Sequence, residues 1–220
     1  MEEKPDRRWI ILAAFMVVAV GVVLGIVLSR SGGGDSSSAS AACTEEPSQG
    51  TKSYPCPDLD ETLPDGSTAT VKTNLGTFTI DLATEEAPLT STSFAYLAEQ
   101  GFYDGLTFHR IVPDFVIQGG DPLGNGSGGP GYQVVEKPPK DLTYTSGVVA
   151  MAKSSTAPPG ASGSQFFVVT GADAGLPPEY ALLGRVGQGM DTVTKIGKVA
   201  VVGEKPKKPV VMEKVTIEKG

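Results

Sequence analysis

The most pronounced hydrophobic pattern in the chain is an uninterrupted apolar run over residues 9–28, WIILAAFMVVAVGVVLGIVL, which carries no charge. Twenty helical residues at about 1.5 Å each match the hydrocarbon layer of a membrane, which is about 30 Å thick. Three basic residues at positions 4–8 precede the run, against Arg30 alone soon after it, and this excess indicates a cytoplasmic N-terminus. We therefore expect a cytoplasmic segment at 1–8 and one transmembrane helix at 9–28. The rest of the chain would then lie outside the cytoplasm, at the cell membrane.

A cleaved signal peptide is the alternative, because Ala39, Ser40 and Ala41 would suit a cleavage site. The apolar run is longer than the roughly 7–15 residues of most signal peptides, and that site lies well beyond its end. We therefore favour an uncleaved anchor.

Small polar residues dominate from residue 29 to about residue 65. Such a segment buries too little apolar surface to offset the entropy of ordering, so we expect a flexible extracytoplasmic linker. Cys43 and Cys56 both lie in it and leave two alternatives open, a disulfide bond or two free thiols. A metal site is not expected, because two thiols and the distant His109 fall short of a structural zinc set.

From residue 66 to residue 220 the pattern changes to short runs rich in β-branched and aromatic residues, separated by Gly and Pro turns. Within residues 77–82 every second side chain is apolar, as in a strand with one buried face. Residues 89–100 and 190–196 instead place apolar side chains at helical spacing. The pattern predicts a mainly β domain, an antiparallel barrel or sandwich with two helices.

Charge and motif context exclude several classes of function. The 220 residues include 18 basic and 25 acidic side chains, a net charge of −7, so nucleic acid is not an expected partner. His109 is the only histidine and no G-x-S-x-G motif occurs, which argues against a Ser-His-Asp hydrolase. Residues 124–129 fit the spacing G-x-G-x-x-G, but Pro130 follows where a helix would have to begin, so a dinucleotide site is not expected.

Two separated blocks resemble the signature of the cyclophilin family. Residues 108–122, FHRIVPDFVIQGGDP, match the family pattern F-H-R-x-x-x-x-F-x-x-Q-G-G-D, and residues 162–168, SGSQFFV, match N-G-S-Q-F-F-I with Ser162 in place of Asn. The resemblance extends from about Thr68 to the C-terminus and, with the apolar run, is to a membrane-anchored bacterial member. It implies an eight-stranded closed antiparallel barrel capped by two helices, and peptidyl-prolyl cis-trans isomerase activity toward proline-containing polypeptides without a cofactor. Nothing in the sequence calls for more than a monomer.

The resemblance assigns catalysis to Arg110 and Gln118, and the chemistry suits these residue types. An X–Pro bond rotates over a barrier of about 18–20 kcal/mol that arises from amide resonance. A guanidinium that donates to the prolyl nitrogen interacts more strongly with the twisted transition state than with the planar ground state. We expect Arg110 to supply that donor, and Gln118 to orient Arg110 or to hydrogen-bond the substrate backbone. His109 is expected to be structural, because twisting an amide needs no proton transfer.

Proline also needs an apolar site, and the resemblance implies substrate-binding roles for Phe115, Val116, Ala152, Gln165, Phe167, Leu176 and Tyr180. Gly175 and Tyr180 stand where many family members carry a Trp and a His. Gly175 lacks the large side chain that the Trp provides as a wall of the binding site, which argues against strong binding of cyclosporin. We nevertheless expect the isomerase activity to be retained.

We therefore expect an enzyme that accelerates X–Pro isomerisation, a step that otherwise takes tens to hundreds of seconds, during extracytoplasmic protein folding. The alternative is a non-catalytic binding or chaperone module for proline-containing peptides, tethered to the membrane.

Overall fold

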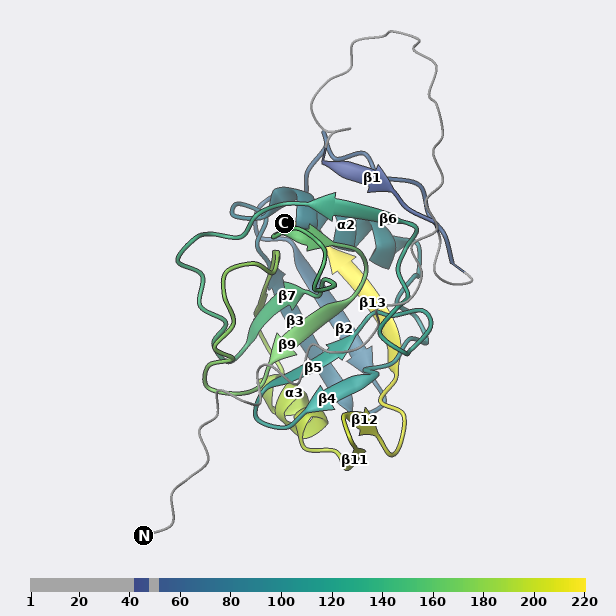
Figure 1. Cartoon of the computed structure of the whole chain (residues 1–220), viewed down its shortest axis with the longest axis vertical. Helices are drawn as coiled ribbons and strands as arrows, with labels where there is room; N and C mark the ends of the chain where they lie inside the picture. The colour runs from purple at the N-terminus through teal and green to yellow at the C-terminus, as the bar shows by residue number, and fades with distance from the viewer. Residues whose placement is uncertain (1–41, 48–51) are drawn as a thin grey trace, which may run out of the picture. The chain divides into compact units, whose positions relative to one another are not determined.

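The computed structural model describes residues 42–47 and 52–220, and its main feature is one antiparallel sheet of eight strands. In chain order these strands are β2 (Thr68–Thr73), β3 (Gly76–Leu82), β4 (Arg110–Val112), β5 (Val116–Gly119), β7 (Val148–Met151), β9 (Phe166–Val169), β10 (Leu182–Val186) and β13 (Met212–Glu218). Their order in the sheet is β13-β2-β3-β10-β7-β9-β5-β4. Helices α2 (Pro88–Glu99) and α3 (Met190–Gly197) lie at opposite ends of the curled sheet (Figure 1). The predicted mainly β domain with two helices is confirmed.

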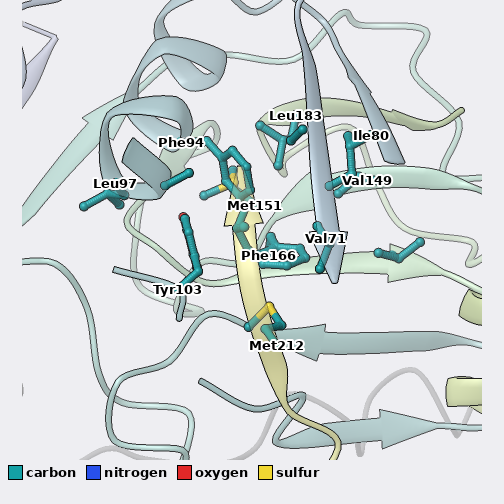
Figure 2. Close-up of a cluster of buried hydrophobic side chains, with 14 of the residues drawn as sticks. Val71, Ile80, Phe94, Leu97, Tyr103, Val149, Met151, Phe166, Leu183 and Met212 are labelled. Carbon is teal, nitrogen blue, oxygen red and sulfur yellow. The ribbon is translucent and has the colours of Figure 1, made fainter. Parts of the chain in front are cut away.

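The strands alternate as the sequence pattern requires, and this alternation builds the core. In β3 the side chains of Phe78, Ile80 and Leu82 are buried while the intervening ones are more exposed. Helix α2 adds Phe94, whose ring stacks on Tyr103 with centroids 4.7 Å apart. Figure 2 shows this part of the core, in which side chains of α2 pack against those of the sheet.

Strands β7 and β9 in the middle of the sheet are buried on both faces. Side chains on one face join the main core, and those on the opposite face join a second apolar cluster. The first set is Val149, Met151, Phe166 and Val168; the second is Val148, Ala150, Phe167 and Val169. The sheet therefore carries apolar residues on the face that points away from the main core, and this face forms the site described below.

The predicted closed barrel is wrong, because the two edge strands of the sheet do not pair with each other in the described part of the chain. Instead, Val211, the residue just before β13, forms an isolated bridge with Thr107 in the segment before β4. The edge of β4 is covered by a hairpin of β11 (Val201–Val202) and β12 (Lys205–Pro206), where Ile111 N donates to Glu204 O at 2.7 Å. Closure needs a continuous ladder around the sheet, and the hairpin occupies the place where β4 would continue that ladder.

The predicted membrane location is also corrected. In the part of the chain that the structure describes, no helix has the length and apolar character needed to cross a membrane. The predicted span at residues 9–28 lies outside the described residues. The single-pass membrane location is accordingly withdrawn, together with the extracytoplasmic setting of the catalytic domain.

The described parts of the predicted linker, residues 42–47 and 52–65, lie against the domain. Cys43 and Cys56 form a disulfide. β1 (Cys43–Glu45) adds an edge to β6 (Tyr132–Val135), which pairs on its other side with β8 (Ala161–Ser162). The ring of Tyr54 meets the ring of Phe102 edge-on at 5.7 Å. The composition did not indicate that this segment packs against the domain. Its few apolar side chains are separated in sequence, and they contact their partners only in the folded domain.

We predict that the disulfide stabilises the folded protein by restricting the unfolded chain. The cysteines are 13 residues apart, and a loop of that size corresponds to about 2–3 kcal/mol. The double variant Cys43→Ser/Cys56→Ser should lose about that much free energy of unfolding in urea, and wild type in a reducing agent should behave like the variant. Equal stability of oxidised wild type and the variant would show that this segment detaches before the domain unfolds.

Candidate active site

The strand register places four of the predicted site residues on one face of the sheet. Arg110 of β4 lies opposite Gln118 of β5, and Gln118 lies opposite Phe167 of β9. Directly opposite residues in antiparallel strands share a face, and so do residues two apart along a strand. Val116 therefore joins this face as well. The cationic head of Arg110 belongs to the same surface as the second apolar cluster.

All six apolar residues predicted to bind substrate belong to the second apolar cluster. Val116, Phe167 and Tyr180 are almost buried, at 2%, 4% and 8% exposure. The other three lie at its margin and are partly exposed: Phe115, Ala152 and Leu176. The remaining members of the cluster are Ala83, Ala87, Leu142, Tyr144, Val148, Ala150, Val169, Ala174 and Leu182. The cluster thus has a packed base and a rim of apolar side chains that a ligand can reach.

Tyr144 fixes the position of Tyr180, a role that the sequence did not reveal. Its hydroxyl donates to Tyr180 O at 2.7 Å and accepts from Tyr180 N at 3.0 Å. The ring of Tyr180 in turn meets Phe167 edge-on, with centroids 5.6 Å apart. Burial raises the pKa of Tyr144 to about 12, although the hydrogen bond to the Tyr180 backbone opposes the rise. Tyr144 is therefore neutral at physiological pH and can make both bonds.

A directional series of hydrogen bonds runs from Arg110 to the glycine-rich loop at residues 124–129. Arg110 Nη1 donates to Gln118 Oε1 at 3.2 Å, and Gln118 Nε2 donates to Gln165 Oε1 at 3.0 Å. Gln165 Nε2 then donates to the carbonyls of Gly126 and Gly128 at 3.0 and 2.9 Å. Because carbonyls only accept, they fix which end of each amide donates. The final acceptor facing Arg110 is therefore the oxygen of Gln118.

The glycine-rich loop that accepts the last of these hydrogen bonds is folded around a buried carboxylate. Asp121 is 2% exposed and accepts from the backbone nitrogens of Leu123 and Asn125 at 2.8 and 2.9 Å, and from that of Gly126. A Cβ at Gly128 would lie 2.1 Å from Asp121 Oδ1, so only glycine fits there. Spacing alone could not assign this role, since the loop matches a nucleotide-binding pattern equally well.

Glu204 also contacts Arg110, from the other side of the guanidinium. Arg110 Nε donates to Glu204 Oε2 at 2.6 Å and Nη2 donates to Oε1 at 3.2 Å. The two residues are 94 positions apart, and no motif in the sequence links them. Burial lowers the pKa of neighbouring His109, although Asp121 opposes the change. A neutral imidazole adds no charge beside Arg110, and no cluster of metal-binding side chains occurs in the described residues.

Comparison with known proteins relates this site to one family. Residues 68–217 match the family model described as cyclophilin type peptidyl-prolyl cis-trans isomerase/CLD. The peptidyl-prolyl cis-trans isomerase-like 1 protein of Neurospora crassa is 41% identical over 133 residues, which are 59% of this chain and 80% of that protein. The human protein of the same name is also 41% identical over 133 residues, or 59% and 78% of the two chains.

A crystal structure of a cyclophilin type peptidyl-prolyl cis-trans isomerase from Cryptosporidium parvum, in the presence of the dipeptide Ala-Pro, superimposes with a TM-score of 0.63. The two are 27% identical, and the match covers 70% of this chain and 99% of that one. None of these relatives supports the bacterial source that the sequence suggested, which stays a prediction.

We predict that Tyr144→Phe lowers the free energy of unfolding by about 1–3 kcal/mol, because it removes the two hydrogen bonds that the buried hydroxyl makes with the backbone of Tyr180. Tyr96→Phe is the matched control, since the ring of Tyr96 packs edge-on against Tyr54 and its hydroxyl makes no hydrogen bond in the described part of the chain. Urea unfolding of both variants checks this. Equal stabilities would mean that water satisfies Tyr180 as well as the hydroxyl does.

The raised pKa of Tyr144 also predicts a pH dependence. The hydroxyl ionises at about 10 in the unfolded chain but at about 12 in the folded one. Its contribution is therefore complete below the unfolded value and is lost as the pH rises through the folded value. The stability difference between wild type and Tyr144→Phe should be constant near neutral pH and shrink between about pH 10 and pH 12. A difference that does not change with pH would contradict this account.

Proposed function

Because this chain belongs to the cyclophilin-type peptidyl-prolyl cis-trans isomerase family, we propose that Arg110 is its catalytic group and that the second apolar cluster binds the substrate proline. The protein is an isomerase of X–Pro bonds. The observation that carries the assignment of residues is the shared face: the Arg110–Gln118 pair lies opposite Phe167 in the strand register, beside the partly exposed rim of the cluster. The apolar surface can bind the proline ring. The free N–H donors of the neighbouring guanidinium can then interact with the nitrogen of the X–Pro bond as that bond twists.

The mechanism follows from the electronic structure of the X–Pro bond. Twisting the bond ends the resonance that keeps it planar and returns the lone pair to the prolyl nitrogen. A guanidinium has five N–H donors. Gln118 accepts one from Arg110 and Glu204 accepts two, so two donors have no acceptor among the described residues. A donor aimed at the nitrogen stabilises the twisted state more than the planar one and so lowers the barrier. The rotation breaks no covalent bond, so the mechanism requires no cofactor.

Substrate binding is assigned to the partly exposed rim: Phe115, Ala152 and Leu176, with Val116, Phe167 and Tyr180 beneath it. A proline ring set against this rim removes apolar surface from water. Both ends of the Gln165 amide already bond within the protein, so we assign Gln165 to holding Gln118 in place. The similarity to a protein crystallised in the presence of Ala-Pro supports proline-containing polypeptides as substrates. We also propose that residues 66–220 form the catalytic domain and that it acts as a monomer.

We predict that Arg110→Ala lowers kcat/KM by on the order of 100-fold, the usual cost of removing one donor aimed at a transition state. Arg110→Lys should recover little, because an ammonium cannot reproduce the planar fork. Arg185→Ala is the matched control, since Arg185 is exposed on β10. The measurement uses the full chain and the exchange rate of an Ala-Pro peptide by NMR, supported by proline-limited refolding.

Wild-type rates in Arg110→Ala would remove the catalytic role from Arg110. Undiminished peptide binding with lost turnover would separate the apolar binding surface from the catalytic donor, as we expect.

A further inference from the structure

The ion pair between Arg110 and Glu204 differs from most ion pairs in the described residues. The Arg110 side chain is only 16% exposed, whereas the lysines paired with Glu213, Asp104 and Glu99 are more than half exposed. Exposed pairs of that kind contribute little, because solvent screens them and two long side chains must be ordered. Glu204 instead engages two nitrogens of one planar group at 2.6 and 3.2 Å, which fixes orientation as well as distance.

The backbone holds Glu204 in place independently of its side chain. Ile111, the residue after Arg110, donates its N–H to Glu204 O at 2.7 Å. Glu204 stands in the turn of the β11–β12 hairpin, between strands paired through Val202 and Lys205. Gly203 in this turn has φ 61°, a value that glycine adopts without strain. Figure 1 shows the hairpin beside β4. The short turn of the β11–β12 hairpin, held by backbone hydrogen bonds, therefore places the carboxylate beside Arg110.

Among the residues that the structure describes, only the 3.2 Å hydrogen bond to Gln118 would hold the guanidinium without Glu204. A guanidinium held at one nitrogen can still rotate about the bonds of its side chain. Its free N–H groups would then point in many different directions. Displacements of about 1 Å in a reacting group can cost on the order of 100-fold in rate. The carboxylate also reduces the net positive charge at Arg110, which works against donor strength. The prolyl nitrogen develops a lone pair and no full charge, so the direction of the donor outweighs its charge.

We propose that Glu204 is a positioning residue for isomerisation: its carboxylate clamps one edge of the Arg110 guanidinium so that the free donors point at the prolyl nitrogen. This inference rests on the catalytic role proposed for Arg110.

The first test separates kcat from KM in Glu204→Gln, Glu204→Asp and the control Glu213→Gln, all in the full chain. Glu213 is an equally exposed glutamate, 43% against 45%, in an ion pair with Lys72. Glu204→Gln should lower kcat about tenfold, with KM changed by less than about twofold, because binding depends on the apolar cluster. Glu204→Asp should be intermediate, since it keeps the carboxylate on a shorter stem, and Glu213→Gln should match wild type. Thermal unfolding establishes that each variant is folded.

The second test combines Glu204→Gln with Arg110→Ala. If Glu204 acts through Arg110, the double variant is as slow as Arg110→Ala alone. An unchanged or higher kcat in Glu204→Gln, or a further loss in the double variant, would overturn the positioning role while leaving Arg110 catalytic. Wild-type activity in Arg110→Ala would instead refute the proposed site itself, so the two failures are distinguishable.

Discussion

The proposed active site depends on the hydrogen bond of 3.2 Å from Arg110 Nη1 to Gln118 Oε1, since it holds the guanidinium at the apolar face of the sheet. An isolated arginine on a strand would sample many rotamers in water, so its N–H donors would have no fixed direction. Here the pairing of β4 with β5 sets the two backbones opposite each other. The buried carboxylate of Asp121 then orders the loop whose carbonyls orient Gln165 and, through it, Gln118.

The apolar half of the site comes from a different constraint, the burial of β7 and β9 on both faces. One face is needed for the core, where Phe166 packs among the rings of Phe94, Tyr103 and Phe108. The opposite face is also apolar, and its exposure to water would be unfavourable. Tyr144 and Tyr180 cover part of this face, while the rim of the second apolar cluster stays accessible. A substrate proline can complete this cover. In the proposed site the same strands therefore contribute both to the stability of the fold and to substrate binding.

The sequence predicted those features that depend on local pattern. Arg110 and Gln118 are separated by eight residues around a turn at Asp114, a spacing that favours their pairing across two strands, and the two helices follow from helical periodicity. Contacts between distant segments could not be predicted. Glu204 reaches Arg110, and Tyr144 holds Tyr180, only because the sheet curls and its loops fold back. The open edge between β4 and β13 and the packing of residues 52–65 have the same long-range origin, and the predicted membrane location had no support in the described structure.

NMR titration of the isotope-labelled full chain with a short Ala-Pro peptide tests most directly whether the polar chain and the apolar rim form one binding site. The reporters are the Arg110 Nε–H, the side-chain amides of Gln118 and Gln165, and the methyl of Ala152. We predict that all four shift together and give one dissociation constant. Binding that shifts Ala152 without the Arg110 and Gln118 signals, or that leaves all four unchanged, would contradict the account.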